Sequence, residues 1–180
     1  MAKLETLSTL KLSDNKIEDI AELKDQTKLK TLCLNGNQIK NIGALSTMTA
    51  LCRLELKDNQ ITSLLPLANA ENLEQLYIDR NKLKNLDGLE HSLELKEVQA
   101  SGNEIENIDG LINCTILEQF YINKNKVSDL SILAKSAGKL KNVYFNDNMV
   151  SDISWLADAV QQMYLSFDRN RVTPEHCECS

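Results

Sequence analysis

Residues 117–130 read LEQFYINKNKVSDL, and residues 73–86, which begin 44 positions earlier, read LEQLYIDRNKLKNL. Both stretches place apolar residues at the same positions around one asparagine, and this asparagine recurs along the whole chain. It stands at Asn15, Asn37, Asn59, Asn81, Asn103, Asn125, Asn148 and Asn170. The interval between neighbours is 22 residues, except for one interval of 23 residues. A fixed period in this range indicates that the chain is an array of stacked structural repeats.

One apolar frame surrounds each asparagine, and it reads L-x-x-L-x-L-x-x-N-x-I-x-x-I-x-x-L. In the first seven repeats all 42 apolar positions of this frame hold an apolar residue, although only 42% of the chain is hydrophobic. The alternating L-x-L segment predicts a short strand whose leucines point inward. Parallel strands need a crossover connection, which the second half of the frame supplies as a short helical or 3-10 segment. We therefore predict an α/β repeat solenoid of about eight repeats with a parallel sheet on one face.

The frame also sets the expected domain organisation. Residues 1–6 form a short N-terminal lead-in, residues 7–172 form the solenoid and residues 173–180 form a tail. The repeats start near positions 7, 29, 51, 73, 95, 117, 140 and 162. Solenoid ends need a polar outer face, but neither MAKLET nor the tail resembles a cap, and repeat eight begins with Gln162. We expect either a fragment of a longer chain or self-association at an open end.

The repeat resembles the leucine-rich repeat signature, and the resemblance covers residues 7–172. The phrases NLDGLE (85–90) and NIDGLI (107–112) resemble the 22-residue class of a nuclear regulatory subunit of protein phosphatase one, a dynein-associated light chain and bacterial internalins. SDLSIL (128–133), SDISWL (151–156) and LLPLANAENL (64–73) are similar to the internalin version. The resemblance implies a right-handed, curved solenoid that binds another protein on its concave sheet.

The eight asparagines are expected to be structural and to take no part in chemistry. Each ends a strand where the chain turns inward, and a buried amide there must be hydrogen-bonded. We predict that each side chain bridges backbone groups of its own turn and of the next repeat. Together they would form an asparagine ladder of eight members.

The aromatic residues divide between the two faces of the predicted sheet. The frame assigns all three phenylalanines to inward positions and all four tyrosines, Tyr77, Tyr121, Tyr144 and Tyr164, to the concave outward face. Tyrosine presents a large, stiff surface with a polar tip and is enriched at binding hot spots. The alternative is that these tyrosines only pack on each other, because sheets favour tyrosine. We favour a binding surface and expect Tyr121 and Tyr144 to touch, since neighbouring strands lie about 4.8 Å apart.

Polar and charged residues in the same outward rows complete the predicted partner-binding surface. Arg80, Lys124 and Arg169 take the loop position just past the strand in their repeats. The remaining candidates are Arg53, Glu55, Asp79, Glu97, Gln99, Asn123, Asn146, Asp147 and Asp168.

Charge argues against two classes of partner. The outward rows hold ten basic and eight acidic residues, whereas the rest of the chain holds ten basic and 18 acidic residues. A nearly neutral face lacks the basic stripe typical of a nucleic-acid binder. The net charge of −6 disfavours an anionic membrane surface, and no apolar run is long enough for a membrane helix.

Cysteine usage and the lack of a secretory signal favour a cytoplasmic or nuclear protein, or a secreted one if the chain is a processed fragment. The five cysteines are odd in number and irregularly spaced. His176, Cys177 and Cys179 in the tail could hold zinc, but a structural zinc site needs four ligands, so we favour a frayed tail and predict no metal. Cys33 lies in an outward row as either a neutral filler or a reactive thiol.

No motif for nucleophilic, phosphate-binding or paired-carboxylate chemistry stands out, so we predict a protein that is not an enzyme and uses no cofactor or small-molecule substrate. The leading hypothesis is a recognition module for another protein, and the resemblance suggests a scaffold or regulatory subunit of a phosphatase or a cytoskeletal adaptor. A second hypothesis is an internalin-like microbial adhesin or effector that binds a host protein. A third is a domain that positions an enzyme within a complex.

Overall fold

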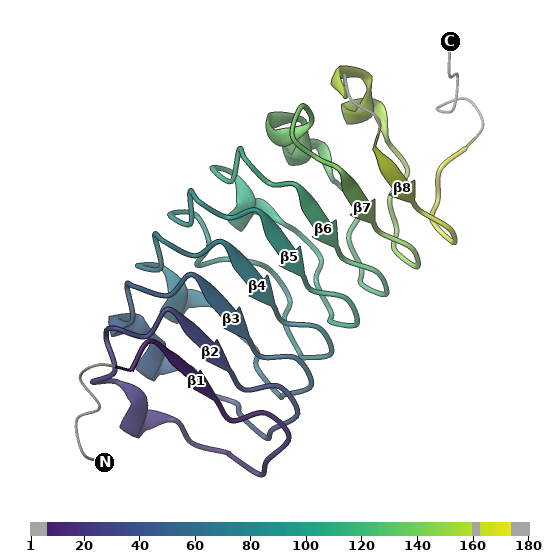
Figure 1. Cartoon of the computed structure of the whole chain (residues 1–180). Coiled ribbons are helices and arrows are strands. Elements are labelled where there is room, and N and C mark those ends of the chain that lie inside the picture. Colours follow the sequence, from purple (N-terminus) through teal and green to yellow (C-terminus); the bar gives the residue numbers. More distant parts are fainter. Residues whose placement is uncertain (1–6, 160–162, 174–180) are drawn as a thin grey trace.

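The computed structural model describes residues 7–159 and 163–173 of the chain. It is a single stack of repeats with one strand each (Figure 1). The strands are β1 (Thr9–Lys11), β2 (Thr31–Cys33), β3 (Arg53–Glu55), β4 (Gln75–Tyr77), β5 (Glu97–Gln99), β6 (Gln119–Tyr121), β7 (Asn142–Tyr144) and β8 (Tyr164–Ser166). They form one parallel sheet in sequence order. The predicted solenoid of eight repeats is therefore confirmed.

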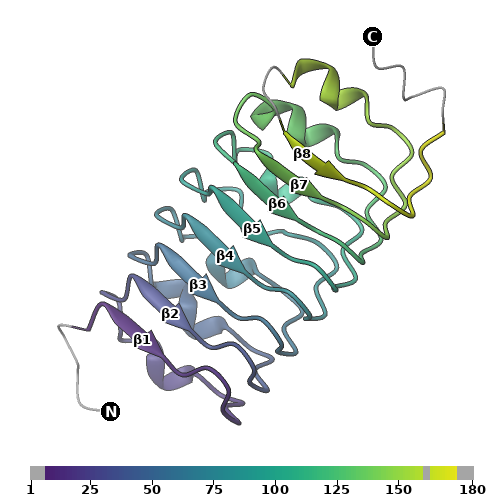
Figure 2. The same ribbon diagram turned by 45° about the vertical axis from the view of Figure 1, so that its right-hand side comes forward.

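Short 3-10 segments run along the side of the stack opposite the sheet, as the turned view in Figure 2 shows. They are η1 (Ala21–Leu23), η2 (Gly43–Thr47), η3 (Leu65–Leu67), η4 (Asp109–Leu111), η5 (Ser131–Ser136) and η6 (Ser154–Asp158). Repeat four differs from the expectation, because turns around Gly88 replace the helical segment there. None of the helices in the described ranges has the length and apolar character needed to cross a membrane.

The core consists of the frame positions, as the period predicts. Each frame position from Ile20 to Ile153 is buried, and Phe120 and Phe145 are its largest fully buried side chains. The Phe145 ring stacks on the partly buried Phe167 ring, with 5.5 Å between centroids. Stacked neighbours thus bury the apolar side of each repeat, which no repeat could bury alone.

One residue per repeat, just past the strand, has a left-handed backbone conformation. These residues are Asp14, Gly36, Asp58, Arg80, Gly102, Lys124, Asp147 and Arg169, with φ between 53° and 70°. Glycine and aspartate tolerate positive φ better than most residues, which accounts for five of the eight. Asp14 and Asp58 thus form the turn that ends the strand in their repeats.

The asparagine ladder exists, but its direction differs from the prediction. Asn81 Nδ2 donates to the carbonyls of Ile78 and Asp79 in its own turn and to that of Leu56 in the preceding repeat. Its Oδ1 accepts the backbone N–H of Ile61, which also belongs to the preceding repeat. The expected bridge to the next repeat is therefore wrong, because the turn directs each asparagine side chain toward the preceding repeat.

The first asparagine shows the consequence of this direction. Asn15 is exposed, and within the described residues it donates only to Leu12 and Ser13 of its own turn, at 2.9 and 3.0 Å. Asn37 and every later member reach the preceding repeat. The ladder of eight predicted from the sequence therefore has seven bridging members.

Candidate protein-binding surface

The register of the sheet places the four tyrosines on one face. Tyr77, Tyr121 and Tyr144 occupy the last position of their strands, in the row that also holds Glu55 and Gln99. Tyr164 lies in the neighbouring outward row, opposite Asn142 of β7. Because successive side chains of a strand alternate between faces, both rows point away from the core.

Tyr121 and Tyr144 form a stacked pair on adjacent strands. Their ring centroids are 5.2 Å apart and their planes differ by 14°, so the predicted contact is confirmed. Both rings are half-buried, and the Tyr121 hydroxyl donates to Gln119 Oε1 at 3.0 Å. Partial burial raises the pKa of Tyr121, with smaller contributions from Glu97 and Tyr144. Tyr164 on β8 is 68% exposed and is the most accessible of the four tyrosines.

Tyr77 is buried instead, with only 7% of its surface exposed. The Arg53 guanidinium lies 4.5 Å from its ring centroid and the Lys57 ammonium lies 5.1 Å from it. Its hydroxyl donates to Glu97 at 2.9 Å and accepts from Arg53 at 3.1 Å. Tyr77 faces outward as predicted, but long charged side chains of neighbouring strands cover its ring and leave little of it accessible to a partner.

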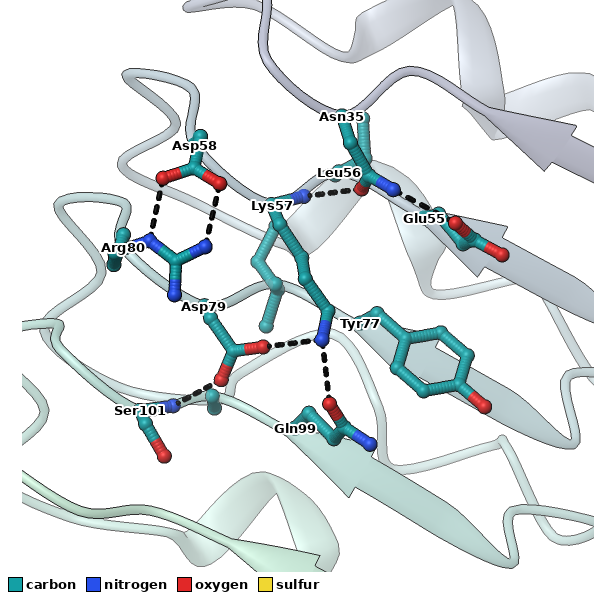
Figure 3. Close-up of polar contacts among 12 residues, drawn as sticks. Asn35, Glu55, Leu56, Lys57, Asp58, Tyr77, Asp79, Arg80, Gln99 and Ser101 are labelled. Atoms are coloured by element: carbon teal, nitrogen blue, oxygen red, sulfur yellow. Dashed lines mark hydrogen bonds and ion pairs between the residues drawn. The ribbon is translucent and has the colours of Figure 1, made fainter. Parts of the chain in front are cut away.

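The residues around Tyr77 form a continuous polar network across β3, β4 and β5. Lys57 bridges Asp79 at 2.9 Å and Gln99 at 2.5 Å, as Figure 3 shows. Arg53 pairs with Glu55 at 2.8 Å. We call this network the charged cluster; its members are Asn35, Arg53, Glu55, Lys57, Gln75, Tyr77, Asp79, Glu97 and Gln99. Asn35, Lys57 and Gln75 were not among the predicted residues, since their partners lie one or two repeats away in the sequence.

The charged cluster gives Tyr77 a measurable signature at high pH. Burial, followed by the hydrogen bond and charge of Glu97, raises the pKa of Tyr77 from 10.0 to about 12. The unfolded chain loses the phenol proton first, so the stabilising contribution is complete below pH 10 and disappears as the pH rises through about 12. In urea unfolding, we expect the free energy of unfolding to fall more steeply over this interval in the wild type than in Tyr77→Phe. Equal slopes would contradict this assignment.

A second row of hydrogen bonds runs along the strand exits and joins repeats four to eight. Asp79 accepts the backbone N–H of Ser101 at 2.8 Å, and the Ser101 hydroxyl accepts that of Asn123 at 3.1 Å. Asn123 Oδ1 accepts from Asn146, whose own Oδ1 accepts the N–H of Asp168. Asn123 and Asn146 were predicted as partner contacts, and the structure places both in this row, which we call the exit row.

The three basic loop residues differ in their partners. Arg80 forms two hydrogen bonds with Asp58, at 2.5 and 2.6 Å (Figure 3). Arg169 makes the equivalent pair with Asp147. These pairs hold the pKa of Asp58 and of Asp147 below the ordinary range, mainly through the arginine hydrogen bonds. Lys124 is exposed and makes no ion pair within the described part of the chain.

A hollow of about 660 Å³ lies over β1, β2 and β3. Its lining consists of Thr9, Lys11, Ser13, Thr31, Cys33, Arg53 and Glu55. Sequence reasoning missed this hollow, although three of the four outward side chains of β1 and β2, those of Thr9, Thr31 and Cys33, are short and were a signal for it. Cys33 is buried, and burial together with Glu55 raises the pKa of its thiol. A thiol that keeps its proton is a poor nucleophile, so the structure supports the filler interpretation.

The cysteines and the other possible metal ligands do not come together as a metal site in the described part of the chain. Cys33, Cys52 and Cys114 are free thiols. No group of three or more His, Cys, Asp or Glu side chains in residues 7–159 and 163–173 could hold a metal ion. The proposed tail ligands His176, Cys177 and Cys179 lie outside the described residues, as do Gln162 and the lead-in.

Comparison with solved structures identifies the type of repeat. Internalin C2 (inlC2) from Listeria monocytogenes is 34% identical, with a TM-score of 0.87, over 91% of this chain and 72% of that one. Internalin (inlF) from the same species is 28% identical, with a TM-score of 0.85, over 89% of this chain and 48% of that one. This chain therefore spans about half of the length of inlF.

A more distant match shares the fold alone. The plant peptide hormone receptor RGFR1, solved in complex with RGF2, is 19% identical, with a TM-score of 0.78, over 94% of this chain and 33% of that receptor.

No curated protein sequence matches the chain. The family described as "Leucine Rich repeats (2 copies)" matches residues 5–47. The chain belongs to the leucine-rich repeat proteins, and its repeats are of the internalin type.

Proposed function

We propose that this protein is a recognition module, without catalytic activity of its own, that binds another protein on its concave sheet. The observation that carries the proposal is the aromatic surface on β6, β7 and β8. There the Tyr121 and Tyr144 rings stack on each other, and the exposed Tyr164 follows on the next strand, in the neighbouring outward row. Tyrosine contributes large contact area at low entropic cost, which is why it is enriched at interface hot spots. We name this surface, formed by Gln119, Tyr121, Asn142, Tyr144, Tyr164 and Ser166, the tyrosine patch.

The charged cluster has a different role in this proposal. Its side chains already satisfy one another, so a partner would have to break existing ion pairs to use them. We therefore assign the binding energy to Tyr121, Tyr144 and Tyr164, while Tyr77 and its neighbours hold the centre of the sheet rigid. Arg80 and Arg169 would orient a partner only at the rim, where exposed charges contribute little affinity.

The similarity to internalins favours the internalin-like version of this function over a phosphatase subunit or cytoskeletal adaptor. Internalin C2 is similar over most of its own length, and the phrases that resemble internalins overlap η3, η5 and η6 on the side opposite the sheet. In this version the chain is a microbial recognition module whose partner is a host protein.

The test uses three baits: the wild-type protein, a triple tyrosine variant and a double leucine variant that serves as the control. We expect Tyr121→Ala/Tyr144→Ala/Tyr164→Ala to lose the partners that the wild type captures from host-cell surface extract, as measured by quantitative mass spectrometry. Leu65→Ala/Leu93→Ala, which removes exposed apolar side chains on the opposite side, should retain them. For an identified partner, each tyrosine substitution should weaken binding by about 1–3 kcal/mol, roughly fivefold to 150-fold in Kd.

The folding of each bait is checked separately by thermal unfolding. Capture of the same partners by the folded tyrosine variant would contradict the proposal, and so would their loss from the Leu65→Ala/Leu93→Ala variant alone.

A further inference from the structure

The tyrosine patch carries no charge on its strands. Its six outward positions hold three tyrosines, two amides and one serine. The ten equivalent positions of β1 to β5 include four charged residues, Lys11, Arg53, Glu55 and Glu97. The concave face is therefore divided into a charged half and a neutral half.

The charges at the rim of the patch also cancel. At the strand entries Lys141 pairs with Glu118 at 2.6 Å. At the exits Arg169 pairs with Asp147. Of the charged residues just past β6, β7 and β8, only Lys124 and Asp168 are then outside these ion pairs, and they carry one charge of each sign. A charged partner group placed over the strands would lose its hydration and find no opposite charge among the six outward side chains to compensate for that loss.

The patch also offers hydrogen-bonding groups that the described part of the chain does not use. The Asn142 amide and the hydroxyls of Tyr144 and Tyr164 have no side-chain hydrogen-bond partner among the described residues. In the charged cluster the corresponding groups of Gln75, Tyr77 and Gln99 are occupied. An asparagine side chain combines N–H donors and a C=O acceptor in one plane, which matches the donor and acceptor of a peptide group.

The dimensions of the patch fit a short stretch of extended chain. Three neighbouring strands span about 10 Å from β6 to β8, which is the length of roughly three extended residues. The backbone groups of β7 are already paired with both neighbours, so a ligand there must be held by side chains rather than by added strand pairing.

We infer that the tyrosine patch binds an extended, uncharged peptide segment of the partner. Asn142 pairs with a backbone amide of the segment, the hydroxyls of Tyr144 and Tyr164 bind further backbone groups, and apolar or proline side chains pack on the Tyr121–Tyr144 stack. This inference rests on the proposed function and adds the chemistry of the ligand to it. Charged segments are rejected because the patch cannot compensate their desolvation.

The probe is a random peptide library displayed on phage and selected on the immobilised wild-type protein. We expect enriched peptides to share an uncharged core that contains proline or apolar residues. The Kd of such a synthetic peptide, measured by isothermal titration calorimetry, should change less than about twofold between about 50 and about 500 mM NaCl, because no ion pair forms.

Two aspartate variants provide a matched comparison in the same outward row. Asn142→Asp keeps the shape of the side chain but adds charge and removes its donors, so we expect Kd to rise at least about tenfold. Thr31→Asp adds the same charge on β2 and should leave Kd within about twofold. Thermal unfolding confirms that each variant is folded.

Three results would overturn the inference: no enriched peptide, a charged consensus with strong salt dependence, or equal effects of the two aspartate variants. If the triple tyrosine variant still abolishes capture of a protein partner, the proposed function survives and only the peptide chemistry fails. If peptide and protein partners both bind the triple tyrosine variant normally, both proposals fail.

Discussion

Asn81→Ala is expected to lower the free energy of unfolding by about 3–5 kcal/mol, since several buried backbone groups lose their partners at about 1–3 kcal/mol each. The side chain is buried in the middle of the ladder. Its amide donates to Leu56, Ile78 and Asp79 and accepts from Ile61. Removing it uncouples repeat four from repeat three at the point where both turns meet. Urea unfolding followed by far-UV circular dichroism measures the loss.

The chain contains its own control for this experiment. Asn15 occupies the same frame position but is exposed, and its side-chain hydrogen bonds to residues 7–159 and 163–173 stay within its own turn. Asn15→Ala should therefore cost about 1 kcal/mol or less. Asn81→Asp keeps the acceptor for Ile61 but removes the amide donors, so its cost should lie between the two. Equal costs for Asn15→Ala and Asn81→Ala would show that the bridging bonds do not couple the repeats.

Gly110→Ala is expected to destabilise the protein by about 3 kcal/mol, at the upper end of the usual cost of overpacking. A Cβ at Gly110 would lie 2.0 Å from the carbonyl oxygen and 2.5 Å from the carbonyl carbon of Leu86. These are backbone atoms of the preceding repeat, so no rotation of a side chain can relieve the clash. The two repeats would have to separate on the convex side and disturb the packing of η4.

Gly138 provides the matched control for this second prediction. No atom lies within 4 Å of a Cβ built there, and its φ is not in the left-handed range. Gly138→Ala should be neutral or stabilising by about 0.5 kcal/mol, because alanine restricts the unfolded chain. Thermal unfolding of both variants decides the matter, and a Gly110→Ala protein as stable as the wild type would show that the close approach is not required.

The fold could be predicted from the sequence because its core depends only on periodicity. A residue such as Leu54 or Phe120 is buried by its place in the frame, whatever its outward neighbours are. The contact between Tyr121 and Tyr144 followed in the same way, since adjacent strands hold equivalent positions side by side. Such features follow from spacing alone.

The state of the outward side chains could not be predicted in this way. Tyr77 and Tyr121 occupy the same frame position, yet one is buried and the other is half-exposed. The difference arises from Arg53 and Lys57, whose long side chains reach the Tyr77 ring from the neighbouring strand and from its exit loop. Likewise, the direction in which the Asn81 amide bonds depends on turn geometry rather than on the spacing between asparagines.

The asparagine ladder and the exit row have a consequence for how such a protein can change in length. The interval from Asn125 to Asn148 contains one extra residue, yet Asn148 still accepts from Val127 and Asn123 still accepts from Asn146. The insertion is absorbed in the segment of η5, the longest 3-10 segment. Evolution can therefore lengthen the 3-10 side of a repeat by single residues. The sheet side, in contrast, changes by exchange of side chains or by duplication of whole repeats.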